Sequence, residues 1–262
     1  MRFLNLSIFL LLLLSLGSIG WAADGWHTLH GNWQRHGYYA DGFPAKNLKL
    51  IWRKELYKEL TGPRAEVIVG GGLAYMGTYA GNMYAWDAQT GEKRWVFQAG
   101  GAIGHSPTYH EGILYFGSMD GRLYAVDTLT GEEKWHVQTC EGIWTSPVIH
   151  QNLVLFGSRD HTFYALKSET GQLAWSFETN GPILQSASIT EDGTKVLFAS
   201  EDMHLYCLAV DDGALVWQTP KLPGLSFRDY FPVIIGETIL LTTNPVKDFH
   251  TILGENQQML LK

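Results

Sequence analysis

Short apolar runs, separated by turns rich in glycine, aspartate and asparagine, fill most of the chain from about residue 65 onward. Runs of this kind are typical of β-strands. The central runs, such as residues 113–117 and 153–157, are almost wholly apolar, which indicates strands that are covered on both faces. No long stretch after residue 25 shows the 3.6-residue apolar period of an amphipathic helix. The pattern predicts an all-β protein in which helix is a minor component.

A unit of roughly 40 residues recurs four times, beginning at Gly72, Gly112, Asn152 and Lys195. Three positions hold the same residue type in all four copies. They are Tyr84, Tyr124, Tyr164 and Tyr206, then Gly91, Gly131, Gly171 and Gly213, then Trp95, Trp135, Trp175 and Trp217. The tyrosines are spaced by 40, 40 and 42 residues, and the two extra residues fall in the turn-rich stretch 191–194. An insertion in a surface turn costs little free energy. A fixed period of this length indicates a repeat architecture.

Each copy is expected to contain four strands, which in the second copy are residues 106–109, 113–117, 122–127 and 133–137. Residues 119–122 form a tight hairpin signal between the middle strands. Such units, repeated around an axis, predict a β-propeller of four-stranded antiparallel blades. We expect four complete blades at about 65–98, 103–138, 143–178 and 183–220, and a partial fifth at 229–262. In the fifth, strands are expected at 230–235 and 238–243, followed by a loop at 244–248.

An Asp-x-x-Thr-Gly-x-x-x-Trp element recurs in these copies and has a structural explanation. In the second copy, Gly131 can adopt the left-handed conformation that the turn requires. Asp127 and Thr130 can bind nearby backbone N–H groups and fix the turn. Trp135, on the outer strand, can then lie flat against the adjacent blade and bury a large apolar area. The residues assigned to this structural motif are Asp87, Thr90, Gly91, Trp95, Asp127, Thr130, Gly131, Trp135, Thr170, Gly171, Trp175, Gly213 and Trp217.

The motif resembles the tryptophan-docking repeat of quinoprotein dehydrogenases and their pyrroloquinoline-quinone (PQQ)-like propeller relatives. Its first two copies carry the pattern in full, the third has Lys167 in place of the aspartate, and the fourth keeps only Gly213 and Trp217. Residues 26–37 resemble the lead-in that often precedes such propellers. The resemblance covers about residues 26–220 and implies relatives with seven or eight blades.

Trp52 lies 43 residues before Trp95, so it marks an outer strand without a blade of its own in front. In the family that the chain resembles, such an N-terminal strand commonly pairs with the last blade, which removes exposed sheet edges. Two alternatives follow: a five-bladed ring closed by the Trp52 strand, or a truncated seven- or eight-bladed ring. We favour the second, because residues 258–262 are mostly apolar and lack a polar end.

The N-terminus has the features of a secretory signal peptide over residues 1–23. Arg2 precedes an apolar run from Ile8 to Leu16, and small residues follow it at 22–23. The run is too short to span a bilayer comfortably, and no later segment could do so. Residues 24–47 form the lead-in segment and residues 48–262 the propeller. We expect export to the periplasm or the extracellular space.

Charge and cysteine content limit the classes of partner. The chain has a net charge of −7 with scattered charges and no basic stripe, which argues against nucleic acid as a partner. Its two cysteines, Cys140 and Cys207, are too few for a disulfide scaffold in 262 residues. We expect them to be two separate residues.

A quinoprotein dehydrogenase, as the resemblance implies, would have a vicinal Cys-Cys disulfide, a calcium ion bound by carboxylate and amide oxygens, and an Asp base. Cys140 and Cys207 are 67 residues apart, and no acidic loop of calcium-binding form is present. The ten histidines show no zinc-binding spacing. Serines recur at Ser106, Ser146 and Ser186, whereas a nucleophile is normally unique. We therefore predict no catalytic residue, metal or cofactor, with PQQ and calcium as the alternative.

A binding surface is the remaining candidate site. In a propeller, the loops before the inner strands and those between the second and third strands gather on one face. Residues that vary between copies on this face are candidates for function, because function is grafted onto such a scaffold. They are His105, Trp144, Gln185, Arg159, His161, Glu201 and His204.

The favoured hypothesis is an exported, non-catalytic propeller that serves as an interaction or assembly scaffold. It would bind another protein or a small ligand on one face, similar to the PQQ-like outer-membrane assembly proteins but without their lipid-attachment Cys. The first alternative is the N-terminal fragment of a PQQ-dependent oxidoreductase whose cofactor site lies elsewhere. The second is the extracytoplasmic sensor domain of a larger protein.

Overall fold

A computed structural model describes residues 27–31, 50–56, 58–62, 65–228, 231–243 and 257–261. The predicted signal peptide, most of the predicted lead-in and the predicted loop at 244–248 lie outside these residues. Among the described residues, the helical structure consists of one short 3₁₀ turn, η1 (Leu29–Gly31). All other regular secondary structure in the described residues is β-strand.

The strands form five antiparallel sheets in chain order. The first blade contains β1 (Ile68–Gly70), β2 (Leu73–Gly77), β3 (Asn82–Asp87) and β4 (Lys93–Gln98). The second contains β5 (Thr108–His110), β6 (Ile113–Gly117), β7 (Arg122–Asp127) and β8 (Glu133–Gln138). The third contains β9 (Val148–His150), β10 (Leu153–Gly157), β11 (Thr162–Lys167) and β12 (Leu173–Glu178). The fourth contains β13 (Ser188–Ile189), β14 (Lys195–Ala199), β15 (Leu205–Ala209) and β16 (Leu215–Gln218).

The fifth sheet has three described strands, β17 (Val233–Ile235), β18 (Thr238–Thr243) and β19 (Gln257–Leu261), paired in that order. The predicted all-β fold, with four complete four-stranded blades and a partial fifth, is confirmed. Each complete blade also carries a register shift between its third and fourth strands, at the residue after Ala85, Ala125, Ala165 or Cys207. A repeated bulge of this kind bends and twists the outer strand.

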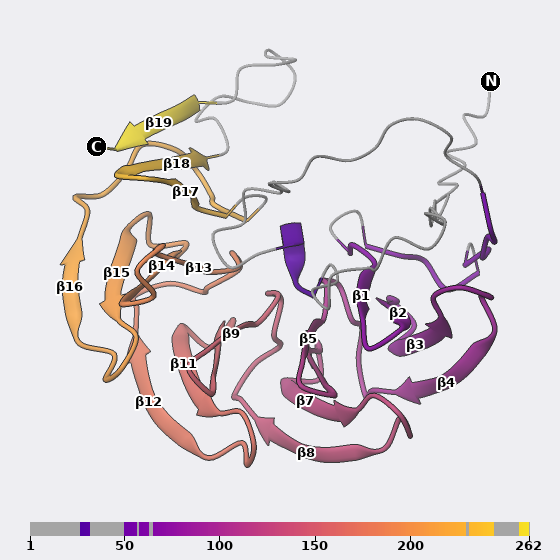
Figure 1. The fold of residues 1–262 in the computed structure, drawn as a ribbon. Coiled ribbons are helices and arrows are strands. Elements are labelled where there is room, and N and C mark those ends of the chain that lie inside the picture. The colour runs from indigo at the N-terminus through magenta and orange to yellow at the C-terminus, as the bar shows by residue number, and fades with distance from the viewer. Residues whose placement is uncertain are drawn as a thin grey trace, which may run out of the picture.

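The blades follow one another along an arc, with the short strands β1, β5, β9 and β13 on its inner side and β4, β8, β12 and β16 on its outer rim (Figure 1). β5 contacts both β1 and β9, and β13 contacts β17. The first blade and the fifth sheet lie at opposite ends of the arc (Figure 1). In the described part of the chain, the segment around Trp52 is not a strand of the fifth sheet.

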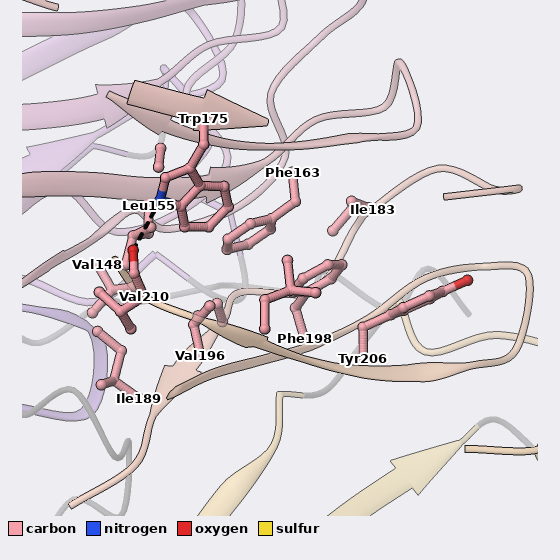
Figure 2. Packing of buried hydrophobic residues seen from close by; sticks show 13 residues of the cluster. Val148, Leu155, Phe163, Trp175, Ile183, Ile189, Val196, Phe198, Tyr206 and Val210 are labelled. Atoms are coloured by element: carbon pink, nitrogen blue, oxygen red, sulfur yellow. Dashed lines mark hydrogen bonds between the residues drawn. The ribbon is translucent and has the colours of Figure 1, made fainter. Parts of the chain in front are cut away.

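The hydrophobic core lies between the faces of successive blades. Between the third and fourth blades, Phe163 stacks on Phe198 with ring centroids 4.0 Å apart, and Ile183 and Trp175 belong to the same buried cluster (Figure 2). The middle strands of the second, third and fourth blades are buried on both faces because each of these blades has a neighbour on either side (Figure 1), and Trp52 packs on the remaining face of the first blade. This explains their nearly continuous apolar sequences.

The outer-strand tryptophans of the first three blades each bind the turn of the next blade. The Trp95 ring packs against Gly131, where a Cβ atom would lie 2.7 Å from Trp95 Cγ. Trp95 Nε1 donates a hydrogen bond of 2.8 Å to the Thr128 carbonyl in the same turn. The other pairs that repeat this arrangement are Trp52 with Gly91 and Ala88, Trp135 with Gly171 and Ser168, and Trp175 with Gly213 and Val210. Figure 2 shows the last of these hydrogen bonds.

The turn itself is fixed by its aspartate. Asp127 Oδ1 accepts hydrogen bonds from the backbone N–H groups of Leu129 and Thr130, at 2.9 and 3.1 Å. Gly131 has a φ of 75°, in the left-handed region that favours glycine. The turn therefore presents a carbonyl acceptor and a flat, side-chain-free surface to the tryptophan of the preceding blade.

Substituting Gly131 by alanine tests this contact. We expect Gly131→Ala to lower the free energy of unfolding by about 1–3 kcal/mol more than Gly72→Ala does. Gly72 has a similar φ of 79° but no atom within 4 Å of its would-be Cβ, so it carries the same backbone strain without the clash. Urea unfolding of the two variants measures the difference. Equal losses would show that the tryptophan contact is not tight.

Candidate functional site

The two predicted sets of loops lie on one face of the propeller. The backbone N–H of Arg159, in the loop between β10 and β11, donates to the Gly142 carbonyl in the loop before β9 at 3.1 Å. The N–H of Ile143 in turn donates to the Ser118 carbonyl of the second blade at 2.9 Å. We call this surface the loop face: the loops 78–81, 118–121, 158–161 and 200–203, with the segments 58–62, 99–107, 139–147 and 179–187.

Two of the seven predicted candidates, His105 and Trp144, are in contact. Their rings meet edge to face with centroids 5.5 Å apart, and the Tyr79 ring stacks on that of Trp144 with centroids 5.8 Å apart. The indole of Trp144 lies over Gly104, where a Cβ atom would come within 2.5 Å of the ring. The first three blades thus contribute one aromatic residue each to a single cluster, and the absence of a side chain at Gly104 makes room for it.

Gln185 is buried, with 1% of its surface exposed. Its Oε1 accepts a 3.2 Å hydrogen bond from the N–H of Ala199, at the end of the second strand of its own blade. Thr145, at the matching position of the third blade, donates to the Gly157 carbonyl at 2.8 Å. A polar side chain at this position therefore fixes the end of the second strand of its blade through a hydrogen bond. Gln185 Nε2 and Trp144 Nε1 are buried donors that have no hydrogen-bond partner among the described residues.

The other four candidates do not join the cluster. Arg159 is exposed and lies 3.8 Å from a carboxylate oxygen of Glu141. His161 has a φ of 71° and takes the turn position that Gly121 occupies in the second blade. Glu201 accepts a 2.9 Å hydrogen bond from the Phe227 N–H, and His204 Nδ1 lies 2.7 Å from the Thr219 carbonyl. The seven residues therefore share a face without converging on one centre.

A repeated aspartate, which the sequence analysis missed, organises the loop face. Asp120 Oδ2 accepts hydrogen bonds from the N–H of Gly100 at 2.8 Å and from the hydroxyl of Tyr124 at 2.6 Å. Asp160 binds the N–H of Cys140 and the hydroxyl of Tyr164 in the same way, and Asp202 binds those of Asn180 and Tyr206. Each carboxylate thus ties its loop to the segment that leaves the preceding blade. The signal was present in the sequence, since each aspartate stands four residues before an anchor tyrosine.

The first blade lacks this aspartate because residue 80 is alanine, and Glu59 supplies the carboxylate. Glu59 Oε2 accepts from Asn82 Nδ2 at 2.8 Å and from Thr78 Oγ1 at 3.1 Å, while its other oxygen binds the hydroxyl of Tyr84. Burial alone raises the pKa of Glu59, but the hydrogen bonds from Tyr84, Asn82 and Thr78 outweigh burial and lower it. Glu59 therefore fastens the segment before the first blade to that blade.

Hydroxyl groups near the inner strands also serve the fold. Ser106 Oγ accepts a 2.8 Å hydrogen bond from the N–H of Glu66 in the first blade, and Ser186 Oγ accepts one of the same length from the N–H of Ser146 in the third. Thr108 donates to the Pro147 carbonyl at 2.7 Å. The recurring serines connect neighbouring blades, which explains why they repeat.

Residues 27–31 lie against the inner strands, a feature that the sequence analysis did not predict. Thr28 and Thr108 share a buried hydrogen bond of 3.0 Å, and Leu29 is buried with 4% of its surface exposed. The backbone N–H of His30 donates to Glu66 Oε2 at 2.9 Å. The centroid of the His30 ring lies 4.7 Å from that of Phe231, just before the fifth sheet. Figure 1 shows η1, in dark purple, on the inner side of the arc.

The described residues contain no group of three His, Cys, Asp or Glu side chains placed to hold a metal ion. Asp120, Asp160 and Asp202 bind backbone N–H groups and tyrosines instead. Cys140 is exposed and Cys207 buried, and both are free thiols. Nothing in the described part of the chain is a helix long and apolar enough to cross a membrane.

Comparisons with known proteins agree on the fold. The family model described as outer membrane protein assembly factor BamB matches residues 45–145 and 103–224. No curated protein matches the chain. The quinohemoprotein alcohol dehydrogenase of Comamonas testosteroni superimposes with a TM-score of 0.70 over 90% of this chain and 45% of that one, at 17% identity. The computationally designed Ika8 protein gives 0.58 over 67% and 54%, also at 17% identity.

At this identity the structural likenesses show the fold alone. The chain spans about half the length of these solved structures.

The role of Glu59 can be tested by moving its carboxylate. We expect Glu59→Ala to lower the free energy of unfolding by about 1–3 kcal/mol, because Thr78, Asn82 and Tyr84 lose their common acceptor. We expect Ala80→Asp in the same chain to restore most of the loss, because it places an aspartate where the next three blades have one. Urea unfolding of the single and double variants measures both effects. A double variant as unstable as Glu59→Ala alone would contradict the role assigned to the Glu59 carboxylate.

The tyrosine–carboxylate pairs predict a loss of stability at alkaline pH. Burial, followed by the hydrogen bond to Asp160, raises the pKa of Tyr164 to about 12. The pKa of Tyr84 rises to about 12 for the same two reasons, with Glu59 as its partner. A tyrosine in the unfolded chain loses its proton near pH 10, so stability should fall as the pH rises from about 10 to 12.

Urea unfolding between pH 9 and 11 measures this fall. We expect a shallower decline for Tyr164→Phe than for the unsubstituted chain. Parallel declines would show that the Tyr164 proton does not contribute.

Proposed function

The chain belongs to the PQQ-like repeat family whose model is described as outer membrane protein assembly factor BamB, and from this premise we propose that it is an exported, non-catalytic scaffold that binds other proteins. The family model covers the four complete blades. The predicted signal peptide at residues 1–23 would deliver the chain to the periplasm or the extracellular space.

The observation that carries this proposal is that carboxylates on the loop face are bound to the protein itself. Asp120, Asp160, Asp202 and Glu59 each accept hydrogen bonds from groups of the fold. A catalytic or metal-binding carboxylate needs its oxygens available to substrate or ion. The groups left over for recognition are exposed side chains such as Arg159 and His161, which suit contact with a protein surface.

The alternative, a fragment of a PQQ-dependent oxidoreductase, is supported by the superposition on the quinohemoprotein alcohol dehydrogenase. The superposition supports this alternative only through the shared fold. Among the described residues no three His, Cys, Asp or Glu side chains are placed together to hold an ion, so this alternative assigns part of the calcium site to groups beyond them.

Titration of the full chain with PQQ and calcium separates the two proposals. We expect no saturable change in the absorbance of PQQ and no reduction of an electron-accepting dye, since no described carboxylate cluster can hold the ion. Stoichiometric binding that is lost in Trp144→Ala, a change in the aromatic cluster of the loop face, would favour the oxidoreductase instead.

Site-specific photo-crosslinking in the source cell tests the scaffold proposal. We expect a photoreactive amino acid at position 159 or 161, both exposed on the loop face, to capture a protein of the outer-membrane assembly machinery. The same group at Glu169, an exposed residue of the turn between β11 and β12, is the control. No adduct at either loop position, or the same adduct at all three, would contradict the proposal.

A further inference from the structure

The two ends of the arc differ from its middle at one repeated position, which lies two residues before each inner strand. In the second, third and fourth blades this position is a serine, namely Ser106, Ser146 and Ser186. In the first blade it is Glu66, before β1, and in the fifth sheet it is Phe231, before β17. A carboxylate at one end of the arc and an aromatic ring at the other therefore replace the serine hydroxyls that connect neighbouring blades.

A second contact supports the equivalence of Phe231 with these serines. The carbonyl of Pro232, the residue after Phe231, accepts a hydrogen bond from the hydroxyl of Ser188 in the fourth blade. The Pro147 carbonyl of the third blade accepts one from Thr108 of the second blade in the same way, and the residue before that proline is the serine of the third blade. The fifth sheet thus joins the fourth blade as the third blade joins the second.

His30 contacts both of these end residues. Its backbone N–H donates to Glu66 Oε2 at 2.9 Å, and its Nε2 lies 3.3 Å from Oε1 of the same carboxylate. Its ring lies against that of Phe231, with centroids 4.7 Å apart. The first blade and the fifth sheet lie at opposite ends of the arc, and η1, which contains His30, lies on the inner side of the arc (Figure 1). A single residue from outside the blades therefore links the two ends.

The residues just before His30 are anchored to the second blade. The His27 carbonyl accepts a hydrogen bond from the N–H of Tyr109 in β5 at 2.8 Å, and Thr28 shares its buried hydrogen bond with Thr108. His30 has a φ of 56°, in the left-handed region that is uncommon for a residue with a side chain. A backbone held in this region indicates surrounding contacts that fix it. Here these are the contacts with the first blade and the fifth sheet.

The contact between His30 and Glu66 is partly solvated. The side chain of His30 has 37% of its surface exposed, and that of Glu66 has 32%. Ion pairs that water reaches are weak. The tryptophans that join successive blades, such as Trp95 and Trp175, are buried. The link between the two ends of the arc should therefore open more readily than the links between successive blades.

We propose that residues 27–31 form an axial strap, a conformational device that holds the fifth sheet to the first blade and can release it. When the strap is docked, His30 joins Glu66 to Phe231. When it is released, the fifth sheet opens away from the arc, while the four complete blades stay joined by their tryptophans. The device lies on the inner side of the arc, so it does not depend on what the loop face binds.

Native-state hydrogen exchange of the full chain with His30→Gly tests the strap. Glycine accepts the positive φ of this position and keeps the backbone N–H that binds Glu66, so the variant removes the ring alone. We expect the backbone N–H groups of β17 and β18 to exchange at least about fivefold faster, because the fifth sheet opens more often. The N–H groups of β10 and β11, in the third blade, should exchange at an unchanged rate.

His136→Ala is the matched control. The side chain of His136 has 38% of its surface exposed, close to the value for His30, and its Nδ1 lies 2.6 Å from Glu133 Oε1. Its ring also contacts an aromatic ring, that of Tyr124, with centroids 6.0 Å apart. All three residues belong to the second blade. The control therefore removes a similar set of contacts within one blade, and exchange in the fifth sheet should not change.

A distance measurement detects the opening itself. Spin labels are attached at Gln89→Cys, in an exposed turn of the first blade, and at Glu237→Cys, in an exposed turn of the fifth sheet. Cys140→Ser removes the exposed native thiol. The distribution of distances between the labels should be broader with His30→Gly than without it. It should also be broader with Thr28→Val, which removes the buried hydrogen bond to β5.

Three results of the exchange experiment would overturn the proposal. They are unchanged exchange in the fifth sheet of His30→Gly, an equal acceleration in the third blade, which would mean a general loss of stability, and the same acceleration in the fifth sheet of His136→Ala. A distribution of label distances that is the same with and without the two strap substitutions would also contradict it.

Discussion

The contact between the tryptophan of one blade and the glycine turn of the next determines how the whole structure is built. A tryptophan buries a large apolar area, and its N–H needs an acceptor when water is excluded. The turn satisfies both requirements, since it presents a glycine without a side chain and a free carbonyl. The contact repeats from Trp52 to Gly213, and it joins each complete blade to the blade or segment before it.

The polar groups of the loop face belong to the same system of contacts. An aspartate of one blade binds the backbone that leaves the blade before it. Glu59, from outside the repeat, binds side chains of the first blade instead. Bound in this way, the carboxylates stabilise loops and hold tyrosine hydroxyls. A face whose repeated carboxylates are committed to the fold is suited to recognising a protein surface through its exposed side chains, and this is the basis of the proposed scaffold function.

Most of the fold could be predicted from the sequence, because one contact between blades recurs and leaves the same motif in each copy. The period, the turn motif and the apolar runs predicted four blades and a partial fifth, and the structure has them. The loop residues were harder to interpret, because their variation between copies reflects different structural neighbours. Glu201, for example, holds the N–H of Phe227 near the fifth sheet. Glu59 and residues 27–31 could not be found from the repeat, since they lie outside it. Glu59 binds side chains of the first blade, and residues 27–31 contact residues as far along the chain as Phe231.

Hydrogen exchange of the tryptophan indole N–H groups, followed by NMR, tests the docking contact most directly. The account predicts slow exchange for Trp52, Trp95, Trp135 and Trp175, whose N–H groups are bonded to carbonyls of the next blade. It predicts fast exchange for Trp217, which is exposed. Fast exchange of the four docked residues, or exchange of Trp217 as slow as theirs, would contradict it.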